Sequence, residues 1–526
     1  MADSGAAIIL LTAVAGGIVA FARRRTGTAD GYFLAGRGTG VVTNGSAILG
    51  ECVTAALLVS LVAFAYGPGF DAVLLVAGVA GGLGVALFVA PAFRRSGCYT
   101  IADFAYARFG SDRIRLTTAI VLLLTCLCYL VPLVYSAGAL WAFLGGARVP
   151  GLTSYGTGVA VAGLVSAMCA VASGMKGATL SQAVWSVGLG MMTLVVLATA
   201  IATGPIAQPD GGEALPGATA YLPVAASGEV TDDTTTFSAD TAGGHTVLNR
   251  LSMALSLAFG VAALPHMLMR HGAARSDASA RRSIVWALVS VCAFAGVAGT
   301  AGLSVREPWM ADVLAAGLFA VVSSSVAGVL VAVASTVGHD IYGAYVDPHA
   351  SDDRKVLAGR VTMIGFVALS VSAALAIPEG GLAIGHQALI TLMTASAFSV
   401  ASAAFLPVLI AGISWKRSTE RGALAGMIVG GGGSALFVLA SILAQFGHVR
   451  AEGALAFAGS LAFPTVLTFP AALLAIVVVS GVDGQLPKNL DDAWRTIHGA
   501  PGRLKAGRRS LPVSDARGRA RSPRRA

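Results

Sequence analysis

Long apolar runs, separated by short polar segments, make up most of this chain. A helix that crosses a membrane needs about 20 consecutive apolar residues, and runs of that length recur along nearly the whole sequence. The pattern predicts an all-α polytopic membrane protein with about 13 transmembrane helices. The predicted spans are 5–22, 41–65, 72–93, 117–143, 154–173, 179–203, 247–269, 284–304, 313–338, 357–377, 386–411, 422–446 and 455–480.

The composition supports this interpretation and excludes other classes of protein. Charged residues make up only 12% of the 526 residues, and hydrophobic residues make up 56%. An ordinary soluble domain carries roughly 25% charged residues, so a soluble multidomain enzyme is excluded. The motifs of P-loop ATPases, zinc metalloproteases and serine hydrolases do not occur in the sequence. We therefore expect a membrane protein that is not an enzyme and that uses no cofactor.

The few charges are distributed unevenly between alternate loops. Cytoplasmic loops of membrane proteins carry an excess of Lys and Arg. With thirteen spans, all but four of the 35 Lys and Arg residues fall on one side of the membrane; the exceptions are Arg148, Arg250, Arg306 and Arg450. The distribution predicts an external N-terminus and a cytoplasmic C-terminus in the cell membrane. The net charge of +9 thus reflects topology and does not indicate a nucleic-acid partner.

Two polar segments lie outside the predicted spans. Residues 204–246 are rich in Gly, Thr, Pro and Asp and predict an extracellular loop. Residues 481–526 are rich in Lys and Arg and too polar to bury a core, so we expect a basic, disordered cytoplasmic tail. This tail would serve as an orientation signal; the alternative is contact with anionic lipid headgroups.

Glu51 is a carboxylate deep inside a predicted span. A charge costs about 2.5–3.5 kcal/mol or more at the membrane centre. Such a residue is either protonated and hydrogen-bonded to a neighbouring helix, or part of a functional site. Gly45 and Gly50 lie in the same span and should weaken the helix there. A local break would expose backbone carbonyls as ligands for a small cation, so the stretch predicts a site for a substrate or a coupling ion.

Three consecutive serines occupy the predicted span 313–338, at positions 323–325. Side chains at three successive positions point in nearly all directions around a helix, so at least one hydroxyl must face into the bundle. A serine hydroxyl can also bond to the carbonyl four residues earlier, so the motif alone leaves ion binding open. By contrast, Asp103, His266 and Arg270 fall in or beside predicted cytoplasmic loops, where we expect them to hold loops in place.

Six short motifs follow one another along residues 30–480. They are YFLAGR at 32–37, YGPGFD at 66–71, YTIADF at 99–104, SGMKGAT at 173–179, LPHMLMR at 264–270 and SDASARRS at 276–283. In this order they resemble the sodium:solute symporter family, and the last two are most similar to its cation/acetate symporter branch.

The resemblance implies a LeuT-type fold, in which two five-helix inverted repeats enclose a site at mid-membrane. The span 41–65 would then be a discontinuous helix. The resemblance also implies a sodium site formed by Gly50, Val53, Val321, Ser324 and Ser325. The implied parts of the chain are a first helix and loop (1–40), a transport core (41–411, with repeats 41–203 and 247–411), two peripheral helices (412–480) and the basic tail.

The predicted substrate site departs from the branch pattern. The branch usually has Gly-Asp-Tyr-Met-Ser-Ala-Ala where residues 50–56 here read GECVTAA. The carboxylate is one methylene longer and the aromatic residue is replaced by Cys52, which reshapes the pocket. We expect the substrate near Glu51, Cys52 and Thr54, opposite Phe259 and Gly260. An ionised Glu51 would repel a carboxylate substrate, so either Glu51 is protonated or a cation lies between them.

The resemblance therefore implies secondary active transport, with sodium-coupled symport of a short monocarboxylate such as acetate. Three alternatives remain open: another small solute such as an amino acid, proton coupling through Glu51, and a transporter-like membrane sensor. The expected partners are the solute, the sodium ion and the lipid bilayer.

Overall fold

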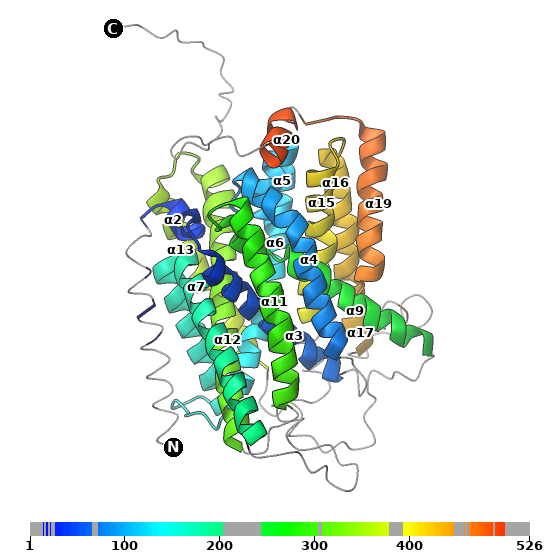
Figure 1. Cartoon of the computed structure of the whole chain (residues 1–526). Coiled ribbons are helices and arrows are strands. Elements are labelled where there is room, and N and C mark those ends of the chain that lie inside the picture. The colour runs from blue at the N-terminus through cyan, green and yellow to red at the C-terminus, as the bar shows by residue number, and fades with distance from the viewer. Residues whose placement is uncertain are drawn as a thin grey trace, which may run out of the picture.

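The computed structural model describes residues 27–65, 72–202, 243–302, 308–377, 393–445, 463–487 and 490–499, together with a few isolated positions. These residues form a helical bundle in which α3 runs obliquely (Figure 1). The longer helices are α3 (Val41–Ala65), α4 (Ala72–Ser96), α6 (Asp112–Phe143), α7 (Ser154–Ala202), α9 (Gly243–Ala263), α11 (Asp277–Gly302), α12 (Pro308–Ser335), α13 (Asp352–Leu375), α17 (Gly433–Gln445) and α19 (Thr465–Asp483). The shorter ones are α2 (Ala29–Phe33), η1 (Ala35–Arg37), α5 (Ile101–Phe109), α10 (Pro265–Gly272), η2 (Thr336–Val346), η3 (Ala401–Phe405), α15 (Leu406–Ser414), α16 (Glu420–Met427), η4 (Ile428–Gly432) and α20 (Leu490–His498).

Ten helical stretches within the described part of the chain are long and apolar enough to cross a membrane. This confirms a polytopic all-α membrane protein. One of the ten, α7, has 49 residues, far more than the roughly 20 that a single crossing needs. Its two halves correspond to the predicted spans 154–173 and 179–203. The total of thirteen spans and the side of each terminus remain predictions, since the predicted span 5–22 and the predicted loop 204–246 lie largely outside the described residues.

The bend in α7 lies at Gly174, whose backbone angles are φ 57° and ψ −147°. Only glycine adopts this conformation readily. A Cβ atom at this position would lie 2.3 Å from the carbonyl oxygen of Tyr32 in α2. The Tyr32 hydroxyl in turn donates to the carbonyl of Val171 at 2.8 Å. This hydrogen bond holds α2 against α7 at the bend.

Substitution of Gly174 by alanine should therefore destabilise the protein markedly. The strained backbone alone costs on the order of 1–3 kcal/mol, and the clash with Tyr32 adds to it. The expected result is a lower unfolding temperature of the purified protein in detergent. Gly188→Ala is the matched control, because a Cβ atom at Gly188 of the same helix meets no atom within 4 Å. Equal unfolding temperatures for the two variants would contradict this account of the bend.

The predicted break in the span 41–65 is wrong. Helix α3 is continuous through Gly45 and Gly50, and a Cβ atom at these positions would lie 2.4 Å from Trp286 and 2.5 Å from Gln182, respectively. These two glycines therefore permit close approach of neighbouring helices and do not interrupt their own. The break occurs instead between α9 and α10, where Leu264 takes up an extended conformation (φ −55°, ψ 132°). The cause is Pro265, which lacks an N–H and disfavours helical geometry in the residue before it.

Residues 481–526 were expected to be disordered, but Leu490–His498 forms α20, which packs at the end of the bundle beside α4 and α5 (Figure 1). Leu490 and Ile497 are buried, and the Arg95 side chain donates to the carbonyl of Ile497 at 2.7 Å. The prediction failed for this segment because its few apolar residues share one helical face, a pattern that the overall composition hides. Residues beyond 499 lie outside the described part of the chain.

Candidate functional site

The helix α12 lies at the centre of the bundle, and its residues from Val321 to Ala334 are all buried. It carries the three consecutive serines, which point to different neighbours. Ser325 lies 2.9 Å from the hydroxyl of Thr54 in α3. Ser324 lies 2.7 Å from the carbonyl oxygen of Val321, and Thr54 donates to the carbonyl of Gly50 at 2.9 Å.

The structure thus brings together four of the five residues predicted to bind sodium. Gly50 and Val321 contribute carbonyl oxygens, and Ser324 and Ser325 contribute hydroxyls. The fifth, Val53, lies on the same helix and is partly buried. All of these groups are uncharged oxygen donors, the chemistry that suits a hard cation. Thr54, predicted as a substrate residue, belongs to this cluster by its contacts.

Gln182 also belongs to this cluster, although it was not among the predicted site residues. Its side-chain amide is wholly buried on α7, after the bend, and its Nε2 donates to the hydroxyl of Ser325 at 2.9 Å. The hydroxyl of Ser324 donates to its Oε1. A polar side chain near the start of the predicted span 179–203 was the available signal, but it does not reveal a partner more than 140 residues away.

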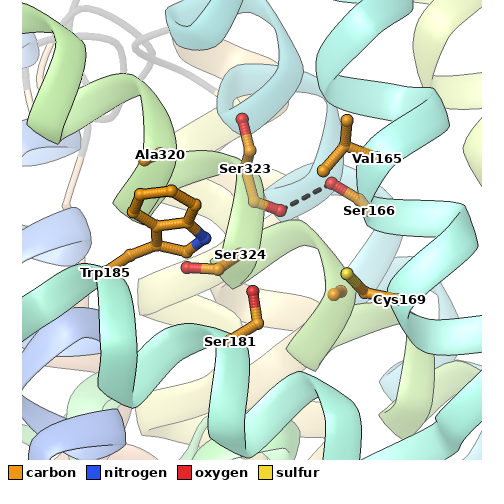
Figure 2. A pocket seen from close by; sticks show the side chains of 9 residues that line it. Val165, Ser166, Cys169, Ser181, Trp185, Ala320, Ser323 and Ser324 are labelled. Carbon is orange, nitrogen blue, oxygen red and sulfur yellow. Dashed lines mark hydrogen bonds between the residues drawn. The ribbon is translucent and has the colours of Figure 1, made fainter. Parts of the chain in front are cut away.

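Figure 2 shows a small pocket beside the serines of α12. It lies between the two halves of α7 and helix α12. The residues that line it include Ser166, Ser181, Ser323 and Ser324. Ser166 donates to the carbonyl of Ser323 at 2.5 Å, the contact marked in Figure 2. Since Ser324 lines this pocket and also contacts Gln182, the pocket adjoins the oxygen cluster.

Glu51 forms a buried ion pair, and its partner was not predicted. One carboxylate oxygen lies 2.6 Å from a guanidinium nitrogen of Arg270, and both side chains are buried. His266 Nε2 lies 3.6 Å from the other carboxylate oxygen, and Arg270 also donates to the hydroxyl of Thr179 at 3.3 Å. The expectation that His266 and Arg270 hold a cytoplasmic loop is therefore wrong. Both lie on α10, which follows the break at Pro265 and remains inside the bundle.

Several polar atoms around this ion pair have no hydrogen-bond partner among the described residues. They are Glu51 Oε2, Tyr129 Oη, His266 Nδ1 and Arg270 Nε. The Tyr129 ring stacks on His266 with the ring centres 5.3 Å apart. Buried polar groups are almost always satisfied, and four unsatisfied atoms in one place therefore indicate that this cluster can accept a polar ligand.

The remaining predicted substrate residues are not all close to Glu51. Cys52 is buried beside it on α3. Phe259 instead packs against Phe469 of α19, with ring centres 4.4 Å apart. Gly260 packs directly against Phe398. Phe259 and Gly260 lie before the break at Pro265. The part of this broken helix that contacts Glu51 is α10, which lies after the break.

A second charged network joins α5, α6 and η2 at one end of the bundle. Arg115 lies 3.0 Å from a carboxylate oxygen of Asp340 and 3.9 Å from one of Asp103. His339 lies 3.5 Å from Asp103. Burial alone would raise the pKa of Asp103, but His339, Arg115 and the backbone N–H of Tyr99 together outweigh it and lower this pKa to about 2. Because Arg115 lies near both carboxylates, this network links the three helices; that Asp103 holds its loop in place remains a prediction.

Comparisons with known proteins identify the family and agree with the fold. A model of the sodium:solute symporter family matches residues 32–303 and 302–430. An uncharacterised symporter of Bacillus subtilis, YwcA, is 28% identical over 467 residues, covering 81% of this chain and 83% of its own. A substrate-bound, outward-open structure of a Na⁺-coupled sialic acid symporter superimposes with a TM-score of 0.62 at 16% identity, covering 91% of this chain and 98% of its own. The last similarity supports the LeuT-type fold.

Proposed function

Because this chain belongs to the sodium:solute symporter family, we propose that it is a sodium-coupled symporter of the cell membrane whose solute is a short monocarboxylate such as acetate. The proposed sodium ligands are Gly50, Val53, Val321, Ser324 and Ser325. The proposed substrate site lies at the ion pair of Glu51 and Arg270, next to Cys52.

The observation that carries the choice of solute is the burial of Arg270. A guanidinium presents five N–H donors, and carboxylates are the anions that match this geometry. Glu51 engages one of its terminal nitrogens, while Nε is without a partner among the described residues. The sequence left two options, a protonated Glu51 or a cation between Glu51 and an anionic substrate, and in this proposal Arg270 is that cation. A substrate carboxylate could then bind to Arg270 without facing an uncompensated Glu51.

Sodium would drive accumulation of this anion. Each net positive charge that moves inward across 100 mV yields about 2.3 kcal/mol, which corresponds to roughly 50-fold accumulation. Thr54 in α3 contacts Ser325 in α12, so a cation bound between these helices would hold them together. Glu51 lies on the same helix α3, only three residues before Thr54, so the substrate site and the sodium site share one element.

A substrate panel tests the choice of solute. Proteoliposomes with an imposed sodium gradient should take up labelled acetate, propionate or pyruvate, and acetamide should not compete, because it lacks the negative charge that Arg270 binds. A proton gradient without sodium should drive no uptake. Competition by acetamide as strong as that by acetate would contradict recognition of an anion.

An amino acid is the second candidate solute. The observation in its favour is that Glu51 Oε2 has no hydrogen-bond partner among the described residues, so it could accept a substrate ammonium group while Arg270 binds the carboxylate. Labelled alanine and proline in the same panel distinguish the two. Sodium-driven uptake of alanine or proline without uptake of acetate would favour this candidate.

A further inference from the structure

Gln182 lies between the two elements that form the proposed sodium site. Its side chain is wholly buried, and it extends from α7 toward Ser324 and Ser325 of α12 on one side and Gly50 of α3 on the other. We propose that Gln182 is a positioning residue that sets how tightly the coupling cation is held. This inference rests on the proposed sodium site, and it concerns a residue outside the predicted ligand set.

The first part of the argument concerns the proton of Ser324. A serine hydroxyl has a single proton, whereas Ser324 lies within hydrogen-bonding distance of two acceptors, Gln182 Oε1 and the Val321 carbonyl oxygen. A cation held by Ser324 and Val321 requires lone pairs from both oxygens. The Ser324 proton must then point elsewhere, and Gln182 Oε1 is the acceptor that receives it. Gln182 thereby leaves both oxygens free to bind the cation.

The second part concerns the hydroxyl of Ser325. Gln182 Nε2 donates a hydrogen bond to this oxygen at 2.9 Å, and Thr54 contacts the same oxygen at 2.9 Å. Because Thr54 donates its proton to the Gly50 carbonyl, Ser325 donates to Thr54 and keeps two lone pairs, one for the amide N–H and one for a cation. The positive end of the amide N–H dipole then lies beside the cation and repels it. Gln182 therefore assists cation binding at Ser324 and opposes it at Ser325. Such a balance keeps a coupling ion from being bound so tightly that it cannot be released.

The third part concerns the room around the amide. A Cβ atom on Gly50 would lie 2.5 Å from Gln182 Nε2, so the amide rests directly on the backbone of α3. Gly50 also supplies one of the proposed carbonyl ligands. The amide therefore has no room to move toward α3, and its contact with Ser325 is fixed by the approach of α3 to α7.

Two substitutions at Gln182 should have opposite effects on sodium affinity. Gln182→Glu keeps an oxygen acceptor for Ser324, replaces the repelling N–H donor with an oxygen and adds a negative charge. We expect it to bind sodium at least tenfold more tightly and to lower the maximal uptake rate through slower release. Gln182→Met has a similar length but no acceptor, so Ser324 must donate to the Val321 carbonyl. We expect it to bind sodium severalfold more weakly, with little change in the substrate KM at saturating sodium.

Equilibrium binding of ²²Na⁺ to the purified full-length protein measures these affinities without any substrate, and sodium-dependent uptake measures the rates. Thr193→Val is the matched control, because it removes another buried hydroxyl of α7, whose hydrogen bond among the described residues goes to the carbonyl of Leu189 in its own helix. Opposite shifts for Glu and Met, with Thr193→Val unchanged, would support the inference. Equal weakening by Glu and Met would overturn it, because that result indicates a merely structural role.

The same binding measurement separates this inference from the proposed sodium site. If ²²Na⁺ binding survives Ser324→Ala together with Ser325→Ala, the sodium site itself is misplaced, and the role of Gln182 is lost with it. If the double serine variant loses binding while both Gln182 variants bind as the unmodified protein does, the sodium site stands and only the role of Gln182 is refuted.

Discussion

Replacing Arg270 with glutamine should abolish uptake and destabilise the protein, because the carboxylate of Glu51 then loses its counter-ion inside the bundle. The two side chains are buried and lie 2.6 Å apart. Removing one partner of a buried ion pair costs about 3–5 kcal/mol, since the remaining charge is left uncompensated. The expected measurements are a strongly lowered unfolding temperature and uptake below about a tenth of the normal rate, which corresponds to a rise of about 1.4 kcal/mol or more in the activation free energy of transport.

Instability and loss of recognition can be separated by removing both charges. The double variant Glu51→Gln with Arg270→Gln should regain most of the stability, because two amides of similar size can hydrogen-bond to each other without an unpaired charge. It should nevertheless fail to take up monocarboxylates. Recovery of acetate uptake in the double variant would show that Arg270 serves only to neutralise Glu51.

Arg108→Gln provides a matched control for the loss of a buried arginine. Arg108 is also wholly buried, and it donates to the carbonyl of Gly412 at 2.9 Å, away from Glu51. Its replacement should lower the unfolding temperature without changing the apparent substrate affinity of the protein that remains folded. A change in substrate affinity as large as that of Arg270→Gln would contradict a specific role for Arg270.

Replacing Ser324 and Ser325 together with alanine should remove sodium coupling. The change deletes both hydroxyl ligands of the proposed site, while the carbonyls of Gly50 and Val321 remain. Loss of two of five oxygen ligands in a buried site should weaken sodium binding by about 100-fold or more, since each unreplaced ligand costs on the order of 1–3 kcal/mol. Uptake should then lose its dependence on sodium over the usual concentration range.

Ser323→Ala is the control that the chain itself offers. Ser323 is the neighbouring serine on the same helix and one of the residues that line the pocket in Figure 2, but its hydroxyl donates to the carbonyl of Phe319 at 2.7 Å. Its replacement should leave the sodium dependence unchanged. If the double variant keeps a normal sodium dependence, or if Ser323→Ala abolishes it, the ligand assignment is wrong.

Much of the fold could be predicted because it depends on local properties of the chain. A spanning helix is defined by the length of its apolar run, so α6 and α13, for example, fall close to the predicted spans 117–143 and 357–377. The position of the helix break could not be predicted in the same way. Glycine at 45 and 50 is compatible with either a break or close helix contact, and only the positions of Trp286 and Gln182 decide between them.

The sequence by itself determined which polar groups must be accommodated inside the bundle. Glu51 and the serines 323–325 stand out in apolar spans because burying an unpaired polar group is costly wherever it occurs. Only the tertiary structure decided what accommodates them. Arg270 is 219 residues from Glu51 along the chain, and Gln182 is 143 residues from Ser325. Contacts of this kind arise from helix packing, and no local pattern of residues encodes which distant side chain will face a given position.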